Sequence, residues 1–211
     1  DVYKRQVRVK NLDEVLSDLR GRDALLSTAH FGCWEYDSFL ALYTGEHYLA
    51  AVYHPLENKV IDAVYMRLRR RRNIRLIPMK EIIRYYIDHR LPAGAPGQRI
   101  GIGLIADQNP PLRPNSHWFR FLNQDTVFFD GIEKMALKFH MPVYFCRQRR
   151  LRRGYYELEF LRLYDGVEQV APNEITERYV RELERVIRER PELWMWSHRR
   201  WKHKRMPDAE R

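Results

Sequence analysis

The sequence predicts an α/β fold: a single domain over residues 1–211, with a mostly parallel central sheet, crossover helices and one antiparallel hairpin. Short apolar runs alternate along the chain with longer amphipathic segments, which is the pattern of successive strand–helix units. The chain has 211 residues, 45% of them hydrophobic and 13% aromatic, which is enough to bury one core. We therefore expect an ordered globular chain.

The first predicted strand–helix unit surrounds a histidine. Residues 24–29 are apolar, as in a buried strand; Gly32 interrupts the run, and residues 35–43 have the composition of a helix. A second strand is predicted over residues 48–53, and an amphipathic helix over residues 58–72. One stripe of that helix carries its apolar side chains, Val60, Ile61, Val64, Tyr65 and Leu68.

The middle of the chain contains the most continuous apolar run, residues 100–106, which predicts a buried strand. A short strand (75–78) and a helix (80–90) precede it, with a Pro/Gly-rich loop between. The two glycines of the apolar run do not form a phosphate-binding loop, because no helix follows; they permit close packing or the approach of a ligand. Residues 107–116 are predicted to be a proline-rich loop.

The last third of the chain predicts an antiparallel hairpin between two helices. A turn at Arg152, Arg153 and Gly154 joins the two strand patterns of this hairpin. The predicted elements are a helix at 131–139, strands at 143–148 and 155–163, and a helix at 174–190 that Pro191 ends.

The charge is strongly positive, with a formal net charge of +10. Arginines cluster at residues 67–75, 147–153 and 199–205. Three interpretations fit: solvated helix ends and turns, a nucleic-acid surface, or a surface for anionic lipids or phosphorylated molecules. Charge alone does not choose among them, but the sequence contains no known nucleic-acid-binding motif.

Two other features limit the class of protein. No run approaches 18 uninterrupted apolar residues, so no membrane-spanning segment is predicted. Cys33 and Cys146 lie far apart and have no metal-binding spacing, and we expect two free thiols.

The most informative motif places His30 at a strand end and Glu35 five positions later. On one continuous helix these side chains would diverge by about 140°, but a strand end and the first turn of the next helix can bring them together. The carboxylate would then hold the imidazole in one tautomer and stabilise its charged form, as a general base requires. The alternative is a strand-end histidine beside an unrelated surface glutamate.

Asp107 also follows a predicted buried strand. If that strand is parallel to the one before His30, both residues lie at the edge of the sheet where α/β proteins bind ligands. The alternative for Asp107 is a turn-initiating aspartate, and the simplest role of Asn58 is a helix N-cap.

Four segments, taken together and in order, resemble the late acyltransferases of lipid A biosynthesis. They are His30–Glu35, Val52–Asn58, Asp107–Pro110 and Trp194–Lys202, and the resemblance covers nearly the whole chain. The spacing from His30 to Glu35 alone is shared with glycerolipid acyltransferases, whereas the four segments together are specific. The resemblance implies a glycerolipid-acyltransferase-like fold.

The resemblance also implies site roles. His30 and Glu35 would be catalytic, while Asp107, Asn58 and an arginine of the 67–72 cluster would bind substrate. We favour Arg69 by its spacing to Asp107, with Arg67 and Arg71 as alternatives. The family transfers acyl chains directly, so Cys33 is expected to be a packing residue rather than a nucleophile, and no metal, nucleotide or organic cofactor is expected.

The implied reaction moves an acyl chain from acyl carrier protein to a hydroxyl of a lipid A precursor. The expected location is the cytoplasmic face of the inner membrane of a Gram-negative bacterium, with the anionic membrane surface as a partner and no nucleic acid. We also expect that this chain lacks the family's N-terminal membrane anchor, and we interpret residues 1–6 as a cloning or sequencing scar.

Two other functions stay open: acyl transfer to another glycolipid, and a non-catalytic basic module that binds anionic lipid or nucleic acid. The C-terminal segment, with Trp194, Trp196, His198 and Trp201, has two interpretations as well. It either contacts lipid headgroups or packs on the core.

Overall fold

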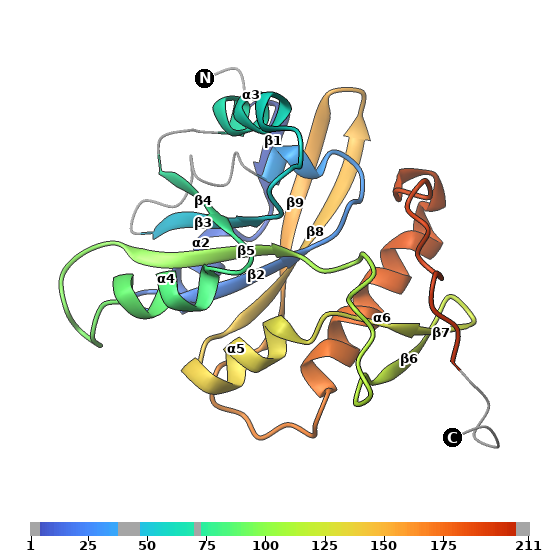
Figure 1. Ribbon diagram of the computed structural model, residues 1–211. Helices are drawn as coiled ribbons and strands as arrows, with labels where there is room; N and C mark the ends of the chain where they lie inside the picture. Colours follow the sequence, from blue (N-terminus) through green and yellow to red (C-terminus); the bar gives the residue numbers. More distant parts are fainter. Residues whose placement is uncertain (1–4, 38–46, 70–72, 206–211) are drawn as a thin grey trace.

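The computed structural model describes residues 5–37, 47–69 and 73–205. Figure 1 shows a twisted sheet with helices on both of its faces. The elements, in chain order, are β1 (Val7–Val9), α2 (Leu12–Asp18), β2 (Ala24–Thr28), β3 (His47–Tyr53), α3 (Lys59–Arg69), β4 (Ile74–Pro78), α4 (Ile82–His89), β5 (Arg99–Ile105), β6 (Trp118–Phe121), β7 (Gln124–Val127), α5 (Gly131–Phe139), β8 (Val143–Arg152), β9 (Tyr155–Tyr164), α6 (Glu174–Glu189) and the short 3-10 helix η2 (Pro191–Leu193).

The central sheet has seven strands in the order β1-β9-β8-β2-β5-β3-β4. Strand β2 lies between β5 and β8 and is parallel to both, and β3 is parallel to β4 and β5. Strands β8 and β9 form an antiparallel hairpin within the sheet. The predicted fold class, a mostly parallel sheet with crossover helices and an antiparallel hairpin, is therefore confirmed.

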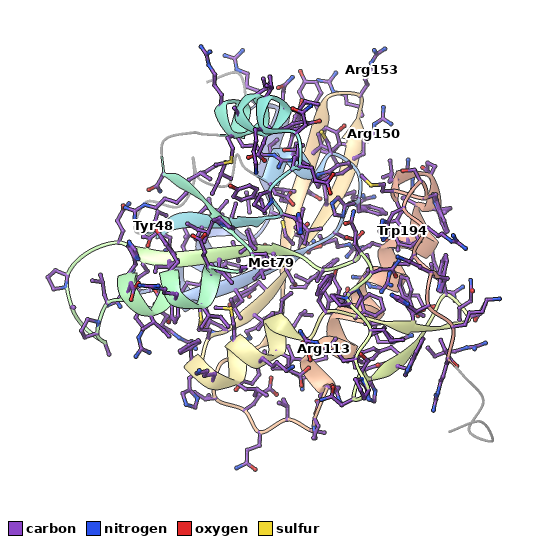
Figure 2. The ribbon with its side chains drawn as sticks, in the orientation of Figure 1. Tyr48, Met79, Arg113, Arg150, Arg153 and Trp194 are labelled. Atoms are coloured by element: carbon purple, nitrogen blue, oxygen red, sulfur yellow. The ribbon has the colours of Figure 1, made fainter. Side chains whose placement is uncertain are left out.

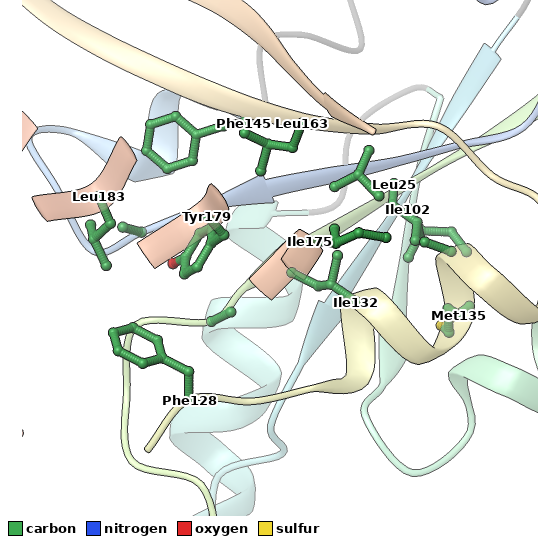
Figure 3. Packing of buried hydrophobic residues seen from close by; sticks show 14 of the residues in the cluster. Leu25, Ile102, Phe128, Ile132, Met135, Phe145, Leu163, Ile175, Tyr179 and Leu183 are labelled. Carbon is green, nitrogen blue, oxygen red and sulfur yellow. The ribbon is translucent and has the colours of Figure 1, made fainter. Parts of the chain in front are cut away.

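Alternation along the strands divides the core between the two faces of the sheet. Leu25 of β2 and Ile102 of β5 are paired in register and point to the face covered by α5 and α6. Figure 3 shows them facing Ile132 of α5 and Ile175 of α6. On the opposite face, Ala24 packs with residues of α2 and β9 in a second apolar cluster.

A second hairpin, β6–β7, forms a separate two-stranded sheet that is not among the predicted elements. Its turn consists of Leu122 and Asn123, both with positive φ, at 48° and 65°. Two-residue turns of this kind usually carry Asn-Gly or Asp-Gly, since leucine adopts positive φ at a steric cost. The usual sequence signal for the hairpin is therefore absent.

Several element boundaries differ from the predictions. Residues 34–37 form a single 3-10 turn where a helix over 35–43 is predicted, and the rest of that range lies outside the described residues. Strand β8 continues to Arg152, beyond the predicted end at 148, because the hairpin projects past the apolar part of the sheet. Its last pairs place exposed arginines opposite partly buried residues, such as Arg149 opposite Glu157.

Helix α3 is amphipathic as predicted, but its apolar side chains point outward. Val60, Ile61, Val64 and Tyr65 are all exposed. Asp62 and Met66 are less exposed than these neighbours. Across the described ranges, no helix is both long enough and apolar enough to cross a bilayer.

Candidate active site

The site lies at the edge of the sheet where β2 and β5 end. These strands are parallel, and their last residues, Thr28 and Ile105, are paired in register. His30 and Asp107 each follow two residues later, so the fold brings together side chains that are 77 positions apart in the chain. The expectation that both residues lie at one edge of the sheet is confirmed.

His30 and Asp107 form a close pair. The Nδ1 atom of His30 lies 2.7 Å from Oδ1 of Asp107, and the backbone N–H of His30 donates to Oδ2 at 3.0 Å. Asp107 is buried, at 2% exposure, while the His30 side chain keeps 17% exposure. With its proton on Nδ1, the imidazole donates to the carboxylate, and Nε2 becomes the basic atom.

A third donor reaches the same carboxylate from the C-terminal segment. The indole N–H of Trp194 donates to Oδ2 of Asp107 at 2.9 Å, and Trp194 is itself buried. The backbone beside it pairs with the loop that carries the histidine: Gly32 donates to Leu193 O at 2.8 Å, and Met195 donates to His30 O at 3.0 Å. The C-terminal segment therefore holds both partners of the His30–Asp107 pair.

Gly32 allows the loop after β2 to turn sharply. Its φ is +63°, a conformation that other residues seldom adopt, and the side chain of Gln148 approaches the space that a Cβ would fill. Gln148 secures the next residue from both sides: its carbonyl accepts from Cys33 N at 2.5 Å, and its amide donates to Cys33 O at 3.0 Å. Burial raises the pKa of the Cys33 thiol, which reduces its thiolate fraction and its reactivity.

Glu35 and Arg69 form a second pair. The Nε of Arg69 donates to Oε2 of Glu35 at 3.1 Å, and its Nη2 donates to Oε1, so the contact is bidentate. The hydrogen bond from this guanidinium to Glu35 raises the pKa of Arg69. Arg69 also lies over the ring of Tyr65, at 5.2 Å from its centroid.

The predicted site residues thus meet in an arrangement that differs in detail from the one expected. The carboxylate at Nδ1 of His30 is that of Asp107, to which the sequence assigned substrate binding, whereas Glu35 binds Arg69. A catalytic role for Glu35 stays a prediction. Asn58 is the N-cap of α3, accepting from Val60 N and Ile61 N at 3.0 Å and 3.1 Å, and its role in substrate binding also stays a prediction.

The structure says less about Arg67 and Arg71, the two alternatives to Arg69. Arg67 is exposed near the end of α3, and Arg71 lies outside the described residues. The structure therefore links Arg69 to the histidine loop through Glu35 and leaves the choice among the three arginines to experiment.

The rest of the C-terminal segment supports the loop after Asp107. Arg200 is buried and donates to Asn109 Oδ1 at 2.8 Å and to Val127 O at 2.6 Å. Desolvation lowers the pKa of Arg200 to about 10. Asn109 N donates to His198 Nε2 at 3.2 Å, and burial, with the nearby Arg200 charge, lowers the pKa of His198.

Of the two interpretations of the C-terminal tryptophans, packing on the core fits Trp194 and Trp201. Trp194 belongs to the main apolar cluster and Trp201 packs against it, whereas Trp196 is 52% exposed. The sequence shows the density of tryptophan, histidine and arginine in this segment. It does not show that the segment returns to the histidine loop.

Asp37 is a further residue that sequence reasoning missed. It accepts from Thr28 Oγ1 at 2.9 Å, and its other oxygen is buried without a hydrogen-bond partner among the described residues. Desolvation raises the pKa of this carboxyl to about 7. Nothing in the sequence distinguishes Asp37 from an ordinary surface aspartate.

No group of three or more His, Cys, Asp or Glu side chains within the described ranges is placed to bind a metal ion. An apolar pocket lies between α2 and the sheet, on the face opposite α5 and α6. Its walls include Leu16 of α2, Leu19 just after that helix and Leu26 of β2. Gly101 of β5 lines the pocket where a side chain would otherwise narrow it.

Fold and site define an α/β protein with a histidine–carboxylate pair at the carboxyl edge of a parallel sheet, a geometry suited to removing a proton from a bound hydroxyl. Residues 1–203 match the family of bacterial lipid A biosynthesis acyltransferases, and the chain belongs to this family. No curated protein matches the chain. Family membership supports an acyltransferase with a lipid A-type acceptor in a bacterial, membrane-associated process.

Proposed function

We propose that the protein transfers a fatty acyl chain from the thioester of acyl carrier protein to a hydroxyl of a lipid A precursor, with His30 as general base. The observation that carries the proposal is the 2.7 Å contact between His30 Nδ1 and Asp107 Oδ1 at the edge of the sheet. The family supplies the reaction class and the acceptor class. The carrier-protein donor and the base are the proposal's own additions.

In this mechanism Asp107 accepts the Nδ1–H of His30, so Nε2 can take the proton of the acceptor hydroxyl. The resulting alkoxide attacks the thioester carbonyl, and an oxyanion forms on the carbonyl oxygen. When this intermediate collapses, the new ester forms and the carbon–sulfur bond breaks. The imidazolium returns its proton to the departing thiolate, and Asp107 stabilises the charged imidazolium in between.

Glu35 and Arg69 have linked roles. Glu35 engages two of the five N–H groups of Arg69 and so fixes the orientation of the guanidinium. The remaining N–H groups suit a phosphate, on the acceptor or on the phosphopantetheine arm of the carrier protein. Glu35 also places a negative charge on the same loop as the imidazolium, and Asn58 contributes a polar group at the start of α3.

The charge distribution fits these partners. Acyl carrier protein is acidic, and a net charge of +10 favours its encounter with this chain. The same charge favours an anionic membrane surface over nucleic acid when it is taken with the family. The corresponding location is the cytoplasmic face of the inner membrane of a Gram-negative bacterium. The reaction as proposed uses no cofactor.

The test is acyl transfer by the purified chain, with acyl carrier protein thioester as donor. Lipid A precursor and a second glycolipid serve as alternative acceptors. His30→Ala should lower transfer at least about 100-fold, the scale of losing a general base. His89→Ala, an exposed histidine on α4, is the matched control and should be silent. Near-normal transfer by His30→Ala would refute the mechanism, and preference for the second glycolipid would change the acceptor.

A further inference from the structure

The surface of α3 is the least expected feature of the fold. Its apolar side chains are turned to solvent, with exposures of 74% for Val60, 47% for Ile61, 53% for Val64 and 45% for Tyr65. Positions i, i+1, i+4 and i+5 lie on one side of a helix, so these four side chains form one continuous stripe. We call this stripe the α3 face.

A helix on a globular protein normally turns its apolar stripe toward the core. Contiguous exposed apolar patches on soluble proteins usually mark sites that contact another molecule or a membrane. Here the side toward the protein carries Asp62, whose carboxylate accepts from Leu56 N at 2.9 Å, and Arg69, which binds Glu35. The Asp62 contact is local to the start of the helix, whereas the Arg69 contact joins this side of α3 to the loop that carries His30.

Cations flank the α3 face. Arg67, exposed near the end of the helix, borders the stripe, and Lys59, also exposed, begins the helix on its other side. The chain continues with Arg70, Arg71 and Arg72. Aliphatic side chains bordered by Lys and Arg are the composition of a helix that lies in a membrane interface, with its apolar side among the acyl chains and its cations at the lipid phosphates.

The β8–β9 hairpin projects on the same side of the molecule. Figure 2 shows Arg150 and Arg153 at its tip, on the side where α3 lies. Between the tip arginines, Leu151 is 45% exposed. A second element therefore presents cations around an apolar side chain. An acidic protein partner would account for the cations, but not for the aliphatic stripe of α3.

The position of α3 relates this surface to the site. From β3 the chain passes through α3 to β4 at the edge of the sheet, and from β4 it returns through α4 to β5 in the opposite direction. Because both crossovers are expected to be right-handed, the two helices lie on opposite faces of the sheet. The contact between Arg69 and Glu35 joins α3 to the loop that carries His30. A surface bound through α3 would therefore lie next to the site.

We propose that the α3 face is the surface through which this protein docks onto an anionic phospholipid membrane. This proposal rests on the proposed function, because it specifies how the enzyme meets its membrane partner. Vesicle binding is measured without catalysis, so an experiment can contradict the docking proposal and leave the proposed reaction intact, or the reverse. Val60, Ile61, Val64 and Tyr65 enter the interface. Arg67, with the hairpin arginines, contacts lipid phosphates.

The experiment measures binding of the chain to vesicles of phosphatidylglycerol and phosphatidylcholine, and to phosphatidylcholine vesicles alone. The test variant is Ile61→Ala/Val64→Ala, because alanine keeps the helix while removing apolar surface. The matched control is Ile83→Ala/Ile87→Ala on α4, where the two isoleucines are 47% and 48% exposed on the other face of the sheet. A second variant, Ile61→Asp/Val64→Asp, puts charge on the α3 face. Circular dichroism confirms that each variant is folded.

We expect the alanine variant of α3 to bind anionic vesicles at least about tenfold more weakly than the parent, the aspartate variant to bind more weakly still, and the α4 control to be unchanged. Binding should fall at high salt and on vesicles without phosphatidylglycerol. Equal losses for the α3 and α4 variants, or no loss for either, would overturn the proposal. So would an α3 variant that keeps vesicle binding but loses binding to acyl carrier protein.

Discussion

Trp194 donates its indole N–H to the carboxylate of Asp107 at 2.9 Å, although 87 positions separate the two residues in the chain. The oxygen that accepts this bond also accepts the backbone N–H of His30, at 3.0 Å. Asp107 is therefore fixed from two directions while its other oxygen holds the imidazole. The C-terminal segment belongs to the site as much as the histidine motif does.

The first prediction separates the two carboxylates. Asp107→Asn should lower acyl transfer at least about 100-fold, because an amide cannot hold the imidazole in the basic tautomer or stabilise its positive charge. Glu35→Ala should lose most activity through release of Arg69, and Glu35→Asp should keep part of it. Steady-state kinetics with saturating donor measure these effects. Full activity in Asp107→Asn together with a dead Glu35→Ala would make Glu35 the orienting carboxylate.

The second prediction concerns the arginines at the end of α3. Residues two apart on a helix diverge by about 200°, so Arg67 and Arg69 cannot both face the site. Arg69→Ala should give the severe loss, because Arg69 contacts Glu35, and Arg67→Ala and Arg71→Ala should be mild. Transfer assays at low and high salt provide the readout. Three equal, modest losses that salt suppresses would instead indicate a diffuse positive surface.

The third prediction tests Trp194 as a positioning residue. Trp194→Phe keeps an aromatic ring beside Phe121, whose centroid lies 5.9 Å away, but removes the donor to Asp107. We expect kcat to fall roughly tenfold with little change in KM, since a hydrogen bond to a charged group is worth about 1.5–3 kcal/mol. Without this donor the negative charge of Asp107 is less compensated and favours the protonated imidazole more strongly, so the acidic limb of the pH–rate profile should move to higher pH.

The matched control is Trp196→Phe, since the indole of Trp196 donates to Pro191 O at 2.6 Å, away from Asp107. This variant should leave the pH–rate profile in place. If Trp194→Phe lowered thermal stability and kcat without moving the acidic limb, the role of Trp194 would be packing alone.

The fourth prediction concerns the pH dependence of stability. Desolvation raises the pKa of Asp37 from 3.8 to about 7 in the folded state. Between these values the folded chain keeps a proton that the unfolded chain has lost, so the free energy of unfolding falls as pH rises and levels off above about pH 7. Asp37→Asn removes this fall. It should stabilise the protein at about pH 8, by at most about 4 kcal/mol, and change little at about pH 4.

Chemical denaturation of the two proteins at both pH values measures this difference. Thr28 can still donate to the amide oxygen that the Asp37→Asn substitution introduces, so the local hydrogen bond is kept. Equal stabilisation at both pH values would show that the effect does not come from ionisation of Asp37.

The parallel sheet was predictable from the sequence because its central strands are short apolar runs with clear breaks between them. The parallel pairing of β2 and β5 also made the meeting of His30 and Asp107 predictable. The β6–β7 hairpin was not predictable, because its turn uses Leu122 rather than a residue suited to positive φ. The orientation of α3 was not predictable either. An apolar stripe in the sequence shows which side of the helix is apolar, but not whether that side faces the core or the solvent.

The partner of each charged site residue could not be derived from spacing. His30 and Glu35 are close in sequence, which favoured their pairing, yet the nearer carboxylate in space comes from the end of another strand. Trp194 and Arg200 act over still longer separations, 87 positions to Asp107 and 91 to Asn109. Local patterns carry little information on contacts of this range.

The pairing of residues 193–195 with the loop around His30 has a consequence for biosynthesis. The chain leaves the ribosome from its N-terminus, so the sheet and the histidine motif emerge long before Trp194 does. Until that segment emerges, Asp107 has no indole donor and Gly32 has no backbone acceptor on Leu193. A nascent chain halted before residue 193 would therefore contain His30 and Asp107 without the contacts that this segment makes to them and to their loop.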